Sequence, residues 1–407
     1  MPAAGETVGG RFELHERVGS GGFATVWRAH DADTDRDVAL KLGDTTTNDA
    51  DAVHAGFERE ARTLGRFQET IAPASVVRYV AGDPAAETPY VALEYLPDAP
   101  LDERIRDGVG SSVRRRVALD LAATMDFLHR NGVVYLDLRP ENVVVRNSGR
   151  PVLLDFNTAA TTDRPVETRF EADQFKPLEL IGGVEDRAGV EPGPWSDVYA
   201  WGKLAFYLFT GAKVLPEDVP ASGLDPLSFG GTCSRALAEV VERATVPDPE
   251  ARYADGPTLA GAVARATGRQ RALVTQRSTD VACPVADDET MGRLAPGEPE
   301  PWLVLPDEGA HVSPRHARFE YTPQGWAIED TSLNGTYVGT SEGWTHLLSA
   351  AGRARRGDTD ESPPPKVRLP EGAVIAPVHP EYGIELRLSG LDDADGGDGE
   401  HHPVTGQ

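Results

Sequence analysis

The sequence has little cysteine and lysine and no long apolar run. Its only cysteines, Cys233 and Cys283, lie far apart without zinc-ligand spacing around them, which indicates neither a disulfide framework nor a structural zinc site. No segment approaches the roughly 18 consecutive apolar residues of a membrane helix. The start, MPAAGETVGG, lacks the basic and apolar regions of a signal peptide. We therefore expect a reduced, cytoplasmic protein without a membrane partner.

Positive charge is also scarce. The chain has 40 basic against 65 acidic residues, a formal charge of −25, and only five of the basic residues are lysines. Such a surface repels a phosphate backbone, so we expect no nucleic-acid partner. Dispersed excess carboxylate with little lysine suits high salt, where self-repulsion is screened, and this favours a halophilic host. An ordinary acidic cytosolic protein is the open alternative.

The length of 407 residues predicts two or three domains. The first part is β-rich: RFELHERV and ATVWRAHD alternate around GSGG, and DVALKL and YVALEYL follow. Between these last two, residues 51–67 have helical spacing. From residue 111 the pattern is mostly helical, with RRRVALDLAATMDFLHRNG stopping at Asn-Gly and the almost wholly apolar WSDVYAWGKLAFYLFTG. This α-rich part runs to about residue 268.

A different texture begins near residue 270. Short segments separated by Gly, Pro, Asn and Asp predict an all-β sandwich over residues 270–390: PWLVL, ARFEY, GWAIED, TYVG and IELRL. Residues 341–366 lose this rhythm, and we expect a flexible surface insertion there. The composition of residues 391–407 predicts a disordered acidic tail.

Several residue patterns of the first part suit phosphate handling. VGSGGFATV places Gly19, Gly21 and Gly22 between two strands, where the backbone can closely approach phosphates. The following strand, VALK, carries Lys41. Glu60, on the next predicted helix, is a candidate partner that would hold Lys41 against the phosphates of a nucleotide.

These features occur in order with two further motifs. YLDLRPEN has the D-x-x-x-x-N spacing at Asp137 and Asn142. In VLLDFN, the Asp155-Phe-Asn triplet is similar to a D-F-G motif, with Asp155 as its first residue. The region from about residue 8 to 268 resembles a eukaryotic-type (Hanks-type) Ser/Thr protein kinase. Asp197, Glu179 and Arg252 match structural positions of that family. The resemblance implies an α+β bilobal fold within residues 1–268, with an N-lobe at about 8–96 and a C-lobe at about 97–268.

The resemblance also implies a site and its ligands. Asp137 would orient the hydroxyl of a protein substrate, Arg139 would contact the transferred phosphate, and Lys41 and Glu60 would pair. Arg139 keeps the positive charge that Ser/Thr kinases have two residues after this Asp. Mg²⁺ would be bound by Asn142 and Asp155. The implied ATP site consists of Gly19, Gly21, Gly22, Val26, Ala39, Lys41, Glu94, Asn142 and Asp155.

The sequence departs from this family in the catalytic loop and in the metal motif, as well as at Ala24, which replaces the third glycine of the Gly-rich loop. Tyr135 and Leu136 replace the usual His-Arg, so the cation that pairs with a phosphorylated activation loop is missing, and control by loop phosphorylation is weakened. Asn157 replaces the last Gly of the metal motif, a position where Asn tolerates unusual backbone angles. A pseudokinase scaffold that binds nucleotide and phosphopeptide without catalysis remains the alternative.

The second part contains MGR, SPRHA, SLNGT and IELRL in order, and is similar to a forkhead-associated (FHA) domain. This resemblance implies that Arg293 and Ser313 contact phosphothreonine and that Asn334 holds the peptide backbone. It also implies an internal bracing role for His316, and Gly335 suits a turn with positive φ. The partners would be phosphothreonine-containing proteins or phosphorylated segments of the same chain.

One position of this second motif set is unusual. Pro314 follows Ser313 where the family commonly has a basic residue, and Arg315 comes one step later. We expect Arg315 to be the remaining candidate for that phosphate contact. The open alternative is a sandwich that only packs against the first part.

Overall fold

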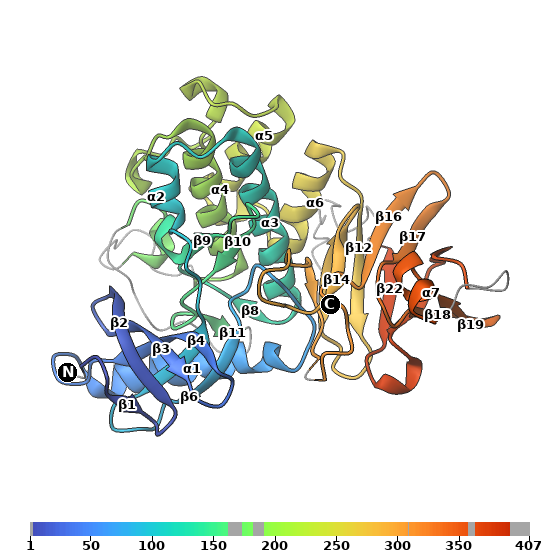
Figure 1. Ribbon diagram of the computed structural model, residues 1–407. Coiled ribbons are helices and arrows are strands. Elements are labelled where there is room, and N and C mark those ends of the chain that lie inside the picture. The colour runs from blue at the N-terminus through green and yellow to red at the C-terminus, as the bar shows by residue number, and fades with distance from the viewer. Residues whose placement is uncertain (1–2, 162–172, 182–190, 308, 357–362, 391–407) are drawn as a thin grey trace, which may run out of the picture.

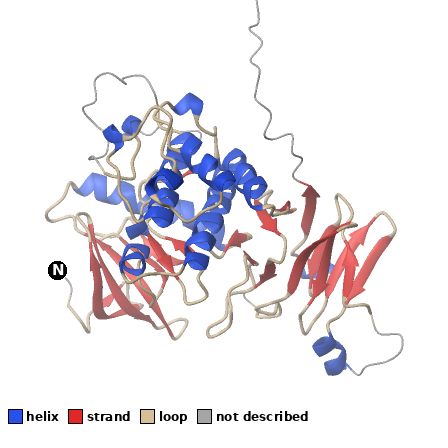
Figure 2. Cartoon of the chain, turned by 90° about the horizontal axis from the view of Figure 1, so that it is seen from above, coloured by secondary structure: helices blue, strands red, loops and turns tan. Residues whose placement is uncertain are grey.

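The computed structural model describes residues 3–161, 173–181, 191–307, 309–356 and 363–390. The tail predicted at 391–407 lies outside these residues. A helical lobe lies in the middle of the molecule, with β-rich parts on either side of it (Figure 2). In Figure 1 the blue N-lobe lies below the helical C-lobe, and the strands coloured yellow to red form the C-terminal part beside it. The predicted order of β-rich, α-rich and all-β parts is confirmed.

The N-lobe contains one antiparallel sheet in the order β1-β2-β3-β4-β7-β6. Its helix α1 (Ala50–Gln68) begins at Asp49, whose side chain accepts from the N–H of Asp51, and the predicted apolar positions Val53, Phe57 and Leu64 are buried. The strands are β1 (Thr7–Val8), β2 (Phe12–Ser20), β3 (Ala24–Asp31), β4 (Arg36–Gly43), β6 (Tyr79–Asp83) and β7 (Tyr90–Glu94).

The C-lobe is built around two helices, α3 and α4. The almost wholly apolar helix α4 is buried as predicted, and its Trp201 Nε1 donates to the carbonyl of Ala118 on α3 at 2.9 Å. The helices are α2 (Leu101–Arg106), α3 (Ser111–Arg130), α4 (Pro194–Thr210), α5 (Arg235–Ala244) and α6 (Gly256–Thr267). The short strands are β8 (Val133–Val134), β9 (Val143–Val145), β10 (Pro151–Leu153) and β11 (Ala160–Thr161).

The C-terminal part consists of two six-stranded sheets, ordered β13-β12-β22-β21-β18-β19 and β20-β17-β16-β14-β15-β5. The strands of the first are β12 (Arg271–Gln276), β13 (Ala282–Ala286), β18 (Thr336–Thr340), β19 (Gly343–Leu347), β21 (Val374–Pro377) and β22 (Leu386–Gly390). Those of the second are β14 (Thr290–Gly292), β15 (Leu303–Val304), β16 (Ala317–Thr322), β17 (Gly325–Asp330), β20 (Lys366–Arg368) and β5 (Ala72–Pro73).

Residues 341–366, predicted as a flexible surface insertion, contain regular elements over part of their length. β19 pairs with β18, and α7 (Ala350–Arg356) follows it. No strand is predicted there from the residue pattern, because the first residues of β19 are exposed and its apolar residues do not alternate with polar ones. Residues 357–362 lie outside the described part of the chain.

One strand of the second sheet comes from the N-lobe. β5 directly follows the α1 region, yet it pairs antiparallel with β15, Leu303 opposite Pro73 and Val304 opposite Ala72. The N–H of Ala74 also donates to the carbonyl of Trp302 at 2.9 Å, and Gln276 Oε1 accepts from the N–H of Ile71 at 2.9 Å. The N-lobe therefore supplies an edge strand to the C-terminal sandwich.

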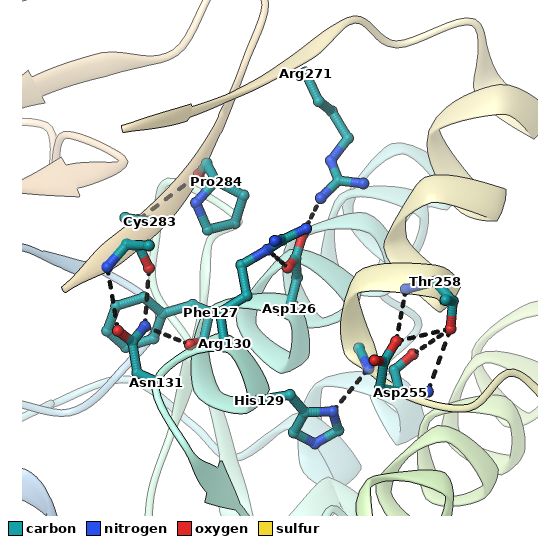
Figure 3. A network of polar contacts seen from close by, with 12 residues as sticks. Asp126, Phe127, His129, Arg130, Asn131, Asp255, Thr258, Arg271, Cys283 and Pro284 are labelled. Carbon is teal, nitrogen blue, oxygen red and sulfur yellow. Dashed lines mark hydrogen bonds and ion pairs between the residues drawn. The ribbon is translucent and has the colours of Figure 1, made fainter. Parts of the chain in front are cut away.

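Polar contacts fix the end of α3 to the same sandwich (Figure 3). The buried Asp126 accepts from Arg130 Nε at 2.5 Å and from Arg271 Nη2. The amide of Asn131 makes two bonds to the backbone of Ala282, donating at 2.8 Å and accepting at 3.1 Å. Since these groups are buried or half-buried, loss of one partner would leave the other unpaired in a poorly solvated place.

A second ionic cluster lies nearby. Arg150, which follows the turn after β9, has Nη2 3.0 Å from Glu289 Oε2 and Nη1 3.5 Å from Asp120 Oδ2 on α3. Arg269 Nη2 lies 2.5 Å from Glu289 Oε1. Burial, opposed in part by these arginines, raises the pKa of Asp120 to about 6.

The apolar core is also shared. One contiguous cluster of buried side chains includes Leu64 of α1, Phe127 of α3 and Val274, Met291 and Leu303 of the sandwich. The boundary predicted near residues 268–270 therefore marks a change of secondary structure, and the apolar core continues across it.

Candidate active site

A pocket of about 450 Å³ lies between the N-lobe sheet and the loops of the C-lobe. Seven of the residues predicted for nucleotide binding line it: Gly19, Val26, Ala39, Lys41, Glu94, Asn142 and Asp155. The pocket wall does not include Gly21 or Gly22, which are exposed in the turn between β2 and β3. The carboxylate of Glu94 is paired with Arg146 at 2.7 Å.

Lys41 of β4 is held between two carboxylates at the inner end of this pocket. Its Nζ lies 2.8 Å from Glu60 Oε2 on α1 and 2.7 Å from Asp155 Oδ1, which follows β10. Burial disfavours the ammonium, but the two carboxylates outweigh it and raise the pKa of Lys41. Glu60 Oε1 also accepts from the N–H of Phe156 at 3.1 Å, so α1 is tied to the loop that carries Asp155. The pocket therefore has a fixed positive charge.

Asp137 and Asn142 lie together on the loop before β9. Asn142 Nδ2 donates to Asp137 Oδ2 at 2.7 Å and to its carbonyl at 2.9 Å, which fixes the carboxylate of Asp137. Burial raises the pKa of Asp137, and this effect is opposed by Lys176, whose Nζ lies 3.0 Å from Asp137 Oδ1. Lys176 is not among the site residues that the sequence predicts. Lysine is scarce in this chain, with only five residues, and this scarcity is the signal in the sequence that could have singled out Lys176.

Arg139 is paired with two carboxylates in the structure. Its Nη1 lies 2.7 Å from Asp173 Oδ2 and its Nε 3.0 Å from Glu141 Oε2. Two of its three guanidinium nitrogens, Nη1 and Nε, are therefore engaged by carboxylates of the C-lobe. The cation in direct contact with Asp137 is Lys176.

The departure at Tyr135 and Leu136 leaves this loop supported. The fully buried Asp197 of α4 accepts from the N–H of Tyr135 at 2.7 Å and from the N–H of Leu136 at 2.6 Å. Leu136 has φ of +69°, a strained value for a branched residue that these bonds hold in place. Because Asp197 binds the backbone, the side chains at 135 and 136 can differ, and the Tyr135 ring packs edge-on against Phe156 at 5.0 Å.

The remaining matches of the first motif set also have partners. Glu179 and Arg252 form a buried pair at 2.6 Å. At the altered metal motif the positive φ of +53° falls on Asp155, and the carbonyl of Asn157 accepts from Arg59 Nη1 at 2.6 Å. In the described ranges no group of three or more His, Cys, Asp or Glu side chains is placed to hold a metal ion. Mg²⁺ in phosphotransferase sites is bound by one or two protein oxygens together with phosphate oxygens, and Asp155 and Asn142, on one pocket wall, fit that arrangement.

The predicted residues of the second site lie on adjoining loops at one end of the sandwich. The N–H of Arg293 donates to the carbonyl of Ser313 at 3.3 Å, and the N–H of Leu333 donates to Ser313 Oγ at 3.2 Å. Asn334 Nδ2 donates to the carbonyl of His311 at 2.7 Å. Arg315 is exposed. The structure thus brings Arg293, Ser313 and Asn334 together.

His316 fastens two of these loops. Its Nδ1 accepts from the N–H of Ser313 at 3.1 Å, so the proton is on Nε2, which donates to the carbonyl of Gly335 at 3.0 Å. Burial lowers the pKa of His316 to about 4. Gly335 has φ of +93°, and a Cβ there would lie 2.5 Å from His346 Nε2. The bracing role of His316 and the positive φ of Gly335 are confirmed.

Comparison with known families gives two matches. Residues 12–228 match the protein kinase domain, and residues 290–350 match the FHA domain. No helix among the described residues has the length and apolar character to cross a membrane.

Three curated proteins illustrate the relationship. A probable serine/threonine-protein kinase of Streptomyces coelicolor, SCO3848, is 26% identical over 260 residues, 60% of this chain and 38% of that protein. The serine/threonine-protein kinase drp72 of Corynebacterium efficiens is 29% identical over 280 residues, 63% of this chain and 51% of that protein. PknB of Mycobacterium tuberculosis is 26% identical over 258 residues, 60% of this chain and 41% of that protein. The matched region spans about half or less of each relative.

Proposed function

The chain belongs to the protein kinase family and contains an FHA domain, and from this premise we propose that it transfers the γ-phosphoryl group of ATP to serine or threonine hydroxyls of proteins. The observation that carries the proposal is the contact of Lys41 Nζ with both Glu60, at 2.8 Å, and Asp155, at 2.7 Å. This arrangement places a fixed cation for phosphate beside a carboxylate for metal in one pocket.

Each residue has a defined task in this proposal. Lys41 binds the phosphates of ATP and is held in place by Glu60. Asp137 accepts a hydrogen bond from the substrate hydroxyl and orients its oxygen toward the γ-phosphate, while Asn142 keeps the Asp137 carboxylate in position. Asp155 and Asn142 would hold Mg²⁺, which supplies charge neutralisation on the phosphate oxygens. Nothing in the described part of the chain favours the alternative of a scaffold without catalysis.

The test is phosphate transfer from radiolabelled ATP by the purified full chain, with Mg²⁺ and a generic Ser/Thr protein acceptor. We expect incorporation by the natural sequence and a loss of about a hundredfold or more in Asp137→Asn. Glu239→Gln removes one carboxylate at an exposed position of α5 and is the matched control. Intact ATP binding without any transfer by the natural sequence would establish the scaffold instead.

We propose for the second site that Arg293 and Ser313 bind the phosphate of a phosphothreonine and that Asn334 binds the backbone beside it. The support is that these three side chains come from separate loops that the hydrogen bonds of Ser313 and His316 fasten together. A docked partner, or a phosphorylated segment of the same chain, would be concentrated near the kinase pocket. Arg293→Ala is expected to abolish binding of a phosphothreonine peptide; unchanged affinity would refute this recognition.

The two free cysteines support a cytoplasmic location for the protein. Cell fractionation tests this, and recovery in an oxidising compartment would contradict it.

A further inference from the structure

The helix α7 lies against the loop that carries Asn334. Two hydrogen bonds attach its start: the N–H of Ser349 donates to Asp330 Oδ2 at 2.7 Å, and Ser349 Oγ donates to the carbonyl of Ser332 at 2.5 Å. Gly352 then comes so close that a Cβ would lie 3.3 Å from the carbonyl of Leu333. These contacts show that α7 packs against the loop that carries Asn334.

The last turn of α7 brings arginines to Asn334. Arg355 Nη1 donates to Asn334 Oδ1 at 3.3 Å, and Arg356 Nη2 donates to the Asn334 carbonyl at 2.8 Å. Both arginines are exposed, so an incoming ligand can reach them. A bond of 3.3 Å is long for a guanidinium donor, and Arg355 can exchange it for a better acceptor at small cost.

Among the described residues, the arginines near Asn334 have no carboxylate partner. Carboxylates outnumber basic residues in the chain, 65 to 40, and many of its arginines are paired with them. In contrast, within the described ranges Arg293 and Arg356 each donate to a backbone carbonyl. Arg355 donates to the side-chain amide of Asn334. Arg293 Nε and Arg353 Nε are buried without a hydrogen-bond partner among these residues. This group of guanidiniums therefore has unused capacity for an anion.

Resting on the proposed phosphothreonine recognition, we propose that Arg355 and Arg356 form a second anion subsite that binds a carboxylate of an Asp or Glu neighbouring the phosphothreonine. Arg293 and Ser313 take the phosphate, Asn334 takes the backbone, and the two arginines bonded to Asn334 face the adjacent peptide side chain. The domain would then select acidic phosphothreonine peptides. The basic residue absent at Pro314 is replaced in this scheme by cations from α7.

The experiment measures binding of synthetic phosphothreonine peptides to the full chain. One peptide has Ala at every neighbouring position, and a set of others has an Asp at each neighbouring position in turn. We expect one Asp peptide to bind about tenfold more tightly than the Ala peptide, the range for one or two charge-assisted bonds at a partly exposed site. Arg355→Gln combined with Arg356→Gln should remove this preference, so that the double variant binds the Asp and Ala peptides with equal affinity.

Controls separate this subsite from the proposed function. Arg368→Gln removes an exposed cation of β20. Arg368 lies near the Gly325 end of β17, at the opposite end of that strand from Asp330, so this variant should keep the preference for the Asp peptide. Arg293→Ala should abolish binding of all phosphopeptides. If the natural sequence binds the Ala and Asp peptides equally, or if the double variant weakens both alike, the second subsite is refuted while phosphothreonine recognition stands. Binding no better than that of the unphosphorylated peptides refutes both.

Discussion

Lys176 Nζ lies 3.0 Å from Asp137 Oδ1, so the carboxylate proposed to orient the substrate is paired with a lysine from a distant segment of the C-lobe. Arg139, two residues from Asp137, is instead held by Asp173 at 2.7 Å. The cation that contacts the Asp137 carboxylate is therefore placed by the fold and not by the local motif.

The first prediction concerns this exchange of cations. We expect Lys176→Met to lower kcat by about a hundredfold, the size of effect seen when one electrostatic contact to the transferring group is lost, and Arg139→Met to lower it by less than about tenfold. Lys176 lowers the pKa of Asp137 against the raising effect of burial, so its loss should also move the acid limb of the kcat profile to higher pH. The prediction would be contradicted if Arg139→Met lowered kcat more than Lys176→Met did and if the pH profile of kcat did not move in Lys176→Met. Arg139 would then be the phosphate contact.

A second prediction tests the contact between α3 and the sandwich. Asp126→Asn removes the charge that Arg271 and Arg130 share in a buried place, and we expect the free energy of unfolding to fall by about 3 kcal/mol or more. Glu58→Gln breaks an exposed pair with Arg62 and should change it by less than about 0.5 kcal/mol. Urea unfolding of the full chain measures both, and equal effects of the two variants would contradict the prediction.

A third prediction follows from the lowered pKa of His316. In the folded protein this pKa is about 4 against an ordinary 6.5, so between these values the unfolded chain binds a proton that the folded protein does not. Stability from this group is full above pH 6.5 and is lost as the pH falls toward 4. The contribution of His316 to the free energy of unfolding should be about 2 kcal/mol smaller at pH 5 than at pH 7.

Urea unfolding at the two pH values checks this prediction. The decrease in the free energy of unfolding from pH 7 to pH 5 should be about 2 kcal/mol smaller in His316→Gln than in the natural sequence. In His15→Gln, which changes an exposed residue, the full decrease should remain. An identical drop in all three proteins would show that His316 does not carry it.

A fourth prediction concerns salt. With a formal charge of −25, self-repulsion should destabilise the folded chain at low ionic strength, and this repulsion is screened as the Debye length shortens to about 3 Å near 1 M salt. We expect the free energy of unfolding to rise steadily with KCl and to be lowest without added salt. Stability that does not change with KCl would remove the case for a halophilic host.

Much of the fold and of the pocket could be predicted from the sequence. Lys41, Glu60, Asn142 and Asp155 lie in motifs whose spacing is set locally by a strand, a helix and a tight loop, and the structure brings them to one pocket. Lys176 could not be placed in the same way, because its contact with Asp137 depends on how an irregular segment returns to the loop.

The contacts between the first and second parts were also beyond the sequence pattern. β5 and β15 have two residues each, too few for any alternation, and they pair across more than half of the chain. The Asn-Gly pair at Asn131 predicts a helix stop. Its position after α3 fits that interpretation, but the bonds of its amide to Ala282 became visible only in three dimensions.

The edge strand β5 has a practical consequence for anyone dividing this protein. A fragment cut at residue 268 would keep Ala72 and Pro73 without β15 opposite them and would lose the part of the shared apolar core that Leu303 and Met291 supply. An open strand edge beside a bare apolar surface invites association between copies. The FHA domain therefore cannot be exchanged as an independent unit: moving it to another kinase, or replacing it in this one, would require redesign of the surface around β5.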